Sequence, residues 1–180
     1  MKIACLGSSS KGNCVFIRSG ETRILIDSGL SCKKTVARLK RLGEDIKEIE
    51  AIVLTHGHED HCKTAAPLSR RYGIPIRANS KTWNFAKGKN YIASSKGVKY
   101  RKFDTGRPFL IGALRIRSYR ASHDAWGTVC FSISDMRHSV GYITDAGEIT
   151  KEMTKALKKR DFLIIESNYD EDMIRNSQIQ

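Results

Sequence analysis

Residues 51–61 read AIVLTHGHEDH, a short apolar run followed at once by three histidines and two carboxylates. The apolar run over 51–54 predicts a buried strand. The end of a strand is a rigid support, and a tight turn after it can aim several side chains at one point. Imidazole and carboxylate groups are suitable ligands for zinc, manganese or iron(II). We therefore predict a divalent-metal centre at the end of this strand.

The spacing of the ligand residues predicts two neighbouring cation positions. His56 and His58 alternate past Gly57 and can reach one ion, whereas Asp60 and His61 lie further along, placed for a second ion. Three of the five histidines of the chain lie in this stretch. The alternative is a polar, solvated loop, but an HxHxDH pattern directly after an apolar strand rarely arises by chance.

Length and cysteine usage indicate one domain in a reducing compartment. A chain of 180 residues is long enough for one hydrophobic core. No apolar run approaches the roughly 18–20 residues of a membrane span. The first residues are too short for a signal peptide and predict a strand. The five cysteines are scattered, with no Cys-x-x-Cys pair, which indicates free thiols and a cytoplasmic location.

The charge of the chain favours a polyanionic partner. Lysine and arginine total 32 against 19 acidic residues, a net charge of +13. Nucleic acid is the first expectation and an acidic membrane the second, with a generic basic protein as the alternative. Residues 96–120 are strongly basic, with Asp104 as the single acid. Strand alternation should place only some of these basic side chains on one face.

Strands and helices alternate in the first half of the chain, and the second half is mainly β. The predicted strands are 2–6, 14–18, 23–26, 51–54, 74–76, 98–103, 108–111, 114–119, 128–134, 140–144 and a last buried strand at 162–165. The predicted helices are 32–42 with Ser31 as its cap, 65–72 with Thr64 as its cap, one opening at Ser80, and one to Lys159 with Thr150 as its cap.

Other strand ends add candidate site residues. His123 and Asp145 each follow a strand, and beside the first cluster we interpret both as metal ligands. His56, His58 and His123 would hold one ion, Asp60 and His61 the other, with Asp145 bridging. Two cations so placed can hold a bridging hydroxide as nucleophile, with Asp60 as the catalytic residue that orients it.

Two further features are open to more than one interpretation. Asp27 ends a strand, where it is either a turn former or a partner that orients a ligand histidine. The loop 7–13 could present backbone N–H groups and polar side chains to a substrate phosphate, and a plain hairpin loop is the alternative. The candidate phosphate contacts in this loop are Ser8, Ser9, Ser10 and Asn13.

The HxHxDH motif, followed in order by His123 and Asp145, resembles the metallo-β-lactamase superfamily. The segments GSSSKGN at 7–13, LIDSGLS at 25–31, RYGIPI at 71–76 and ESN at 166–168 look like the WalJ/YycJ-type branch. This resemblance implies an α+β fold, a four-layer αβ/βα sandwich with two divalent ions, zinc or manganese, at one edge between the sheets. It also implies a metal-dependent phosphodiesterase, because members of that branch are regarded as DNA exonucleases.

Two departures from the branch affect the second ion. Branch members are longer, and their last metal-binding histidine lies near a Gly-His-Leu-Ser run that does not occur before Gln180. Tyr169 stands where the branch tends to have histidine. We therefore expect a single domain over 1–180 that lacks the family's C-terminal region, with the second half of the sandwich incomplete and the second ion weak or absent.

Three functions fit these features. The first is a nuclease acting on DNA in preference to RNA, without a membrane partner. The second is a small-ester hydrolase of the same fold, a thioesterase or lactonase. The third is a catalytically impaired relative that only binds nucleic acid. The fold alone does not separate them.

Overall fold

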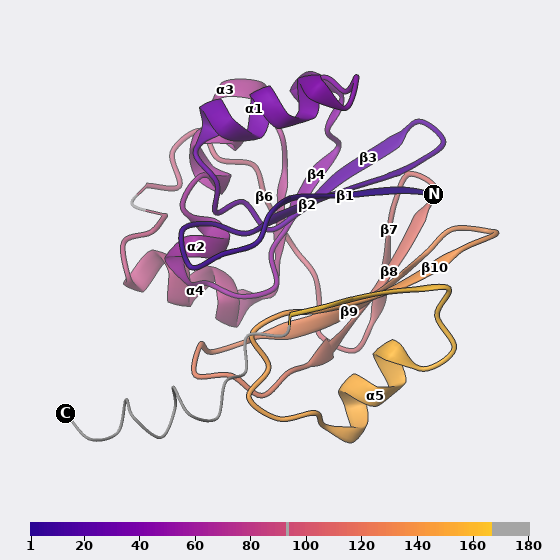
Figure 1. The fold of residues 1–180 in the computed structure, drawn as a ribbon. Coiled ribbons are helices and arrows are strands. Elements are labelled where there is room, and N and C mark those ends of the chain that lie inside the picture. The colour runs from indigo at the N-terminus through magenta and orange to yellow at the C-terminus, as the bar shows by residue number, and fades with distance from the viewer. Residues whose placement is uncertain (93, 167–180) are drawn as a thin grey trace.

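Two β-sheets pack face to face, and helices cover both outer sides (Figure 1). The computed structural model describes residues 1–92 and 94–166. One apolar cluster lies between the first sheet and its helices, a second between the two sheets, and a third between the second sheet and its helix. The predicted four-layer α+β sandwich is confirmed.

The first sheet has six strands and supplies the platform for the HxHxDH stretch. Its strand order is β1-β2-β3-β4-β5-β6. The strands are β1 Lys2–Gly7, β2 Cys14–Ser19, β3 Thr22–Ile26, β4 Ala51–Val53, β5 Ile76–Ala78 and β6 Tyr100–Lys102. Strands β1 to β3 pair antiparallel through short turns, whereas β3 to β6 pair in parallel and therefore need helical crossovers.

The second sheet has five strands in the order β11-β10-β9-β8-β7. The strands are β7 Pro108–Ile111, β8 Leu114–Arg120, β9 Val129–Ser134, β10 Ser139–Ile143 and β11 Phe162–Ile165. Along β8, Leu114 and Ile116 are buried while Arg115 and Arg117 are exposed. Alternation therefore places Arg115 and Arg117 together on the exposed face of β8.

The helices begin and end close to their predicted positions. They are α1 Cys32–Arg41, a 3-10 turn η1 Ile46–Glu48, α2 Glu59–Cys62, α3 Ala65–Tyr72, α4 Ser80–Gly88 and α5 Lys151–Leu157. The side chains of Ser31 and Thr150 cap α1 and α5 as predicted. Thr64 does not cap α3, because its hydroxyl points instead towards the carbonyl oxygens of Ser28 and Leu30, which compete for its single proton.

Two strand predictions need correction. The strand predicted at 74–76 lies at Ile76–Ala78, because Pro75 has no N–H and pairing begins with the bond from Ile76 to the Lys99 carbonyl. Strand β11 exists, but it is not buried: Phe162, Leu163 and Ile165 are each about half exposed. It is the edge strand, paired only with β10 among the described residues.

Two further findings concern the cysteines and the helices. All five cysteines are free thiols, as predicted. Among the described residues, no helix combines the length and the apolar character needed to cross a bilayer.

Candidate metal centre

Four histidines and an aspartate converge at one edge of the sandwich, where strand ends from both sheets meet. His56 follows β4, His123 follows β8, and Asp145 follows β10. His58 stands at the start of α2, and His61 lies within that helix. The short α2 was not predicted, because its four residues show no apolar periodicity. It turns His61 back towards the end of β4.

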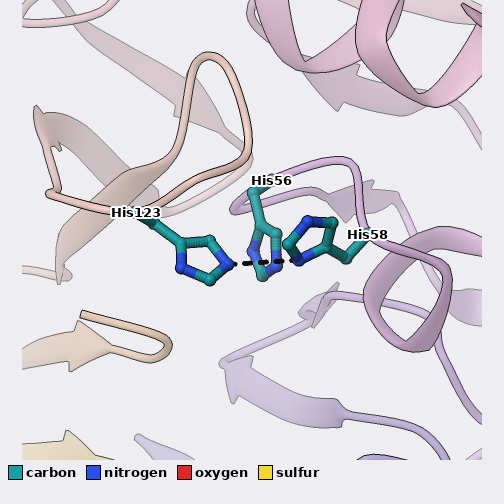
Figure 2. Close-up of side chains that lie close together, drawn as sticks. All are labelled: His56, His58 and His123. Carbon is teal, nitrogen blue, oxygen red and sulfur yellow. Dashed lines mark hydrogen bonds between the residues drawn. The ribbon is translucent and has the colours of Figure 1, made fainter. Parts of the chain in front are cut away.

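The ligand atoms form two groups that share His56. The first group is His56, His58 and His123, and the second is His56, His61 and Asp145. Within each group the ligand atoms lie within 4.8 Å of one another. Figure 2 shows the three rings of the first group facing one another, with His58 Nδ1 3.1 Å from His123 Nε2.

The second group of neighbouring ligand atoms contains His56 as well as two of the residues predicted for the second ion. Asp60 was expected beside His61 and Asp145, but His56 takes its place in the compact trio. Asp60 remains close, with its Oδ2 3.4 Å from His61 Nε2, and Asp145 Oδ2 lies 2.9 Å from the same nitrogen. All six predicted ligands therefore lie at one edge, and their assignment to two ions stays a prediction.

The carboxylate of Asp27 orients His61 directly and His56 through Thr55. Its carboxylate accepts hydrogen bonds from the Thr55 amide at 2.8 Å and the Thr55 hydroxyl at 2.8 Å, and it lies 2.9 Å from His61 Nδ1. A carboxylate is acceptor-only, so His61 Nδ1 carries the proton in that bond. Asp27 is fully buried, which makes this an interior network.

Thr55 fixes the tautomer of His56. Because the Thr55 hydroxyl gives its proton to Asp27, its oxygen is left to accept from His56 Nδ1, 2.9 Å away. The lone pair of His56 then lies on Nε2. This nitrogen is buried and has no hydrogen-bond partner within the described part of the chain. A buried acceptor without a partner, aimed into a cluster of imidazoles and carboxylates, fits a divalent cation.

Burial and neighbouring charges shift the pKa values of His56, His61 and Asp145. Burial, and after it the nearby charge of His61, lower the pKa of His56 to about 2, so His56 is neutral. Burial alone would also lower the pKa of His61, but Asp27, Asp145 and Asp60 outweigh it and raise the value to about 12. Burial raises the pKa of Asp145, and His61 overcomes this and lowers it to about 2. A cation must displace the proton of His61, because a ligating imidazole is neutral.

The predicted phosphate loop divides into an inner and an outer part. Asn13 is buried, and its amide donates to Asp60 Oδ2 at 2.9 Å and lies 2.8 Å from His61 Nε2. The buried side chain of Asn13 therefore contacts two candidate ligands, Asp60 and His61. Ser8, Ser9 and Ser10 are exposed, and Ser10 lines a cleft of 430 Å³ together with His58 and Asp60.

A second cleft opens on the other side of the histidines. Its volume is 440 Å³, and its walls include His123, Arg120 and Trp126. Since His58 lines the first cleft and His123 the second, and their ring nitrogens lie 3.1 Å apart, the two clefts flank one centre.

Sequence reasoning missed three contacts of the site. Sequence analysis assigned no role to Thr55. Glu166 was noted as part of a motif, but its Oε2 accepts from the Asp145 amide at 2.8 Å, where Asp145 has a left-handed φ of 50°. Asp124 Oδ1 lies 3.1 Å from His123 Nε2. The adjacency of Asp124 to His123 was a visible signal, whereas the role of Glu166 depends on the pairing of β11 with β10.

The chain matches the family model of the beta-lactamase superfamily domain over residues 22–179. The chain belongs to the beta-lactamase superfamily. This is a family of metal-dependent hydrolases, and the predicted resemblance is confirmed. Among solved structures, the metallo-beta-lactamase fold protein YhfI from Bacillus subtilis aligns with a TM-score of 0.73 at 21% identity, covering 94% of this chain and 73% of YhfI.

Curated relatives come from more than one branch. The exodeoxyribonuclease YycJ of Bacillus anthracis is 31% identical over 175 residues, which cover 97% of this chain. The match spans 66% of YycJ, slightly less than two thirds of its length. A metal-dependent hydrolase of the UPF0173 group from Rhizobium johnstonii is 34% identical over 132 residues, 69% of this chain and 49% of that protein.

Proposed function

We propose that the protein is a metal-dependent phosphodiesterase that cleaves nucleic acid, with DNA favoured over RNA. The convergence of two overlapping trios of ligand atoms on one open edge carries this proposal. The similarity to an exodeoxyribonuclease over 97% of the chain supports the choice of substrate. The free cysteines fit the predicted cytoplasmic location.

The proposed centre holds two divalent cations, zinc or manganese. The proposed ligands are His56, His58, Asp60, His61, His123 and Asp145. When bound, such a pair of cations would polarise a phosphate and lower the pKa of bound water. Asp27 orients His61 directly and His56 through Thr55.

The side chains around the centre suit a phosphodiester. Asp60, held by Asn13 and partly exposed, accepts a hydrogen bond from the attacking water and orients it. Basic side chains line both clefts and attract the backbone of the substrate; they are Lys11 and Lys63 in one cleft and Lys81, Lys102 and Arg120 in the other. A small thioester or lactone would not require this set of cations.

Substrate choice is tested by cleavage assays across a salt series. Single-stranded and duplex DNA, RNA, a thioester and a lactone are offered to the metal-loaded protein, and oligonucleotide binding is measured from low to high salt. We expect cleavage of DNA. We also expect the logarithm of the oligonucleotide binding constant to fall linearly with the logarithm of the salt concentration. Arg120→Ala should make this line less steep by about 0.7, because each cationic side chain that contacts a single-stranded phosphate releases a counterion.

The matched control is Lys34→Ala, an exposed cation on α1 in the outer helical layer. This variant should keep the slope of the unmodified protein. Rapid hydrolysis of the thioester or lactone, with no salt-dependent binding of oligonucleotides, would replace the nuclease proposal with the small-ester hydrolase.

A further inference from the structure

Trp126 is an exposed aromatic side chain beside the candidate metal centre. Its side chain is 73% exposed, although it lies only three residues after His123. It lines the same 440 Å³ cleft as His123. A single exposed aromatic side chain is common on protein surfaces. Trp126 differs because it lines a cleft that also contains a candidate metal ligand.

The chain on either side of Trp126 is firmly held. The carbonyl of Gly127 accepts from Asn79 Nδ2 at 2.7 Å and from Thr82 Oγ1 at 3.0 Å. On the other side, Ala125 is buried, and its carbonyl accepts from the Thr128 hydroxyl at 2.7 Å. The indole is therefore presented to solvent from a fixed backbone, which lowers the entropy lost when a ligand packs on it.

Three basic side chains line the same cleft as the indole. Lys81 Nζ lies 6.0 Å from the centroid of the Trp126 ring. Arg120 and Lys102 line the cleft as well, and Lys102 is paired with Asp104 at 2.8 Å. An aromatic face with basic side chains beside it is how proteins bind unpaired nucleotides: the base stacks, and the cations contact the phosphates.

We propose that Trp126 is a stacking platform for an unpaired base that flanks the phosphodiester held at the metal centre. This proposal rests on the proposed function, and it adds that the substrate strand is single-stranded at this position. Bases within a duplex are stacked on one another and do not offer their faces. Every base has a π-face, so the platform binds without strong sequence preference.

Tryptophan fluorescence tests the stacking without turnover. The chain has two tryptophans, and Trp83 is buried and stacked on Tyr100 with 4.1 Å between ring centroids. With a chelator present, oligothymidine should quench the emission of Trp126 and leave that of Trp83. Trp126→Phe should abolish the quenching. Equal quenching by a blunt duplex, or quenching that survives in Trp126→Phe, would overturn the proposal.

Binding to oligothymidine and to an abasic strand of equal length separates the base from the phosphates. Trp126→Ala should weaken oligothymidine binding about five- to a hundredfold and leave abasic binding unchanged, because stacking is lost and the phosphate contacts remain. Trp126→Phe should retain most of the affinity. The control is Leu110→Ala, which removes another exposed apolar side chain, on β7; this variant should bind both strands normally.

The remaining outcomes distinguish the two proposals. If the unmodified protein binds both strands and Trp126→Ala binds oligothymidine equally well, the stacking platform is wrong and the nuclease proposal stands. If the unmodified protein binds neither strand, both proposals are wrong.

Discussion

Replacing His56 with alanine should remove most of the bound divalent metal and abolish hydrolysis. His56 belongs to both groups of candidate ligands, and its buried Nε2 points into the centre without a partner among the described residues. Losing an outer partner of a ligand typically costs about 10–100-fold in metal affinity, and losing this ligand should cost more. Metal content after gel filtration and DNA cleavage are measured on the same preparation.

Two other histidines provide the comparison for His56→Ala. His58 belongs to one group only, so His58→Ala should deprive the centre of one cation and leave metal in the other position. His138, on the turn between β9 and β10, lies outside both groups, and His138→Ala should keep full metal content and activity. A folded His56→Ala protein with unchanged metal content would refute the assignment of the centre.

Replacing Asp27 with alanine should destabilise the protein and weaken metal binding together. Asp27 is fully buried, and its carboxylate holds Thr55 and His61. Its removal leaves their donors without an acceptor and the charged His61 without its innermost counterion. Breaking a buried pair in this way costs about 3–5 kcal/mol of unfolding free energy. Urea unfolding of the metal-free protein gives this quantity directly.

Asp27→Asn is the sharper form of the same experiment. Asparagine keeps the shape and an acceptor oxygen for Thr55, but it directs an amide donor at the donor Nδ1 of His61 or at the Thr55 hydroxyl. Metal affinity should fall about 10–100-fold, with a smaller loss of stability than in Asp27→Ala. Glu50→Ala, which removes an exposed carboxylate, is the control for stability. If Asp27→Asn binds metal normally, Asp27 has no orienting role.

The strands and the ligand residues could be predicted because their signals are local. The apolar run ending at Val53 and the HxHxDH pattern that follows it are contiguous in the sequence. The family resemblance added the layered architecture. Local signals therefore predicted the elements, and the resemblance supplied their arrangement in two sheets.

The contacts that tune the site could not be predicted from spacing. Asn13 was interpreted as a phosphate contact because it lies in a small polar loop, but tertiary packing turns its amide inward to Asp60 and His61. Gly29 shows how tight this packing is, because a Cβ there would collide with the Asp60 carbonyl. The exposure of β11 could not be predicted from its apolar sequence either, because it depends on the position of this strand at the edge of its sheet.

A stepwise titration of zinc or manganese into stripped protein, following bound metal and DNA cleavage together, tests the central claim most directly. The two ligand groups share His56, whose Nδ1 is bonded to Thr55. The Nε2 of His56 is therefore its one available ligand atom, and this atom can bind only one of the two cations. We therefore expect one tightly bound cation per chain, a second that binds more weakly, and cleavage that rises as the second position fills. A stripped protein that binds no cation, or cleaves DNA equally well without one, would contradict the account.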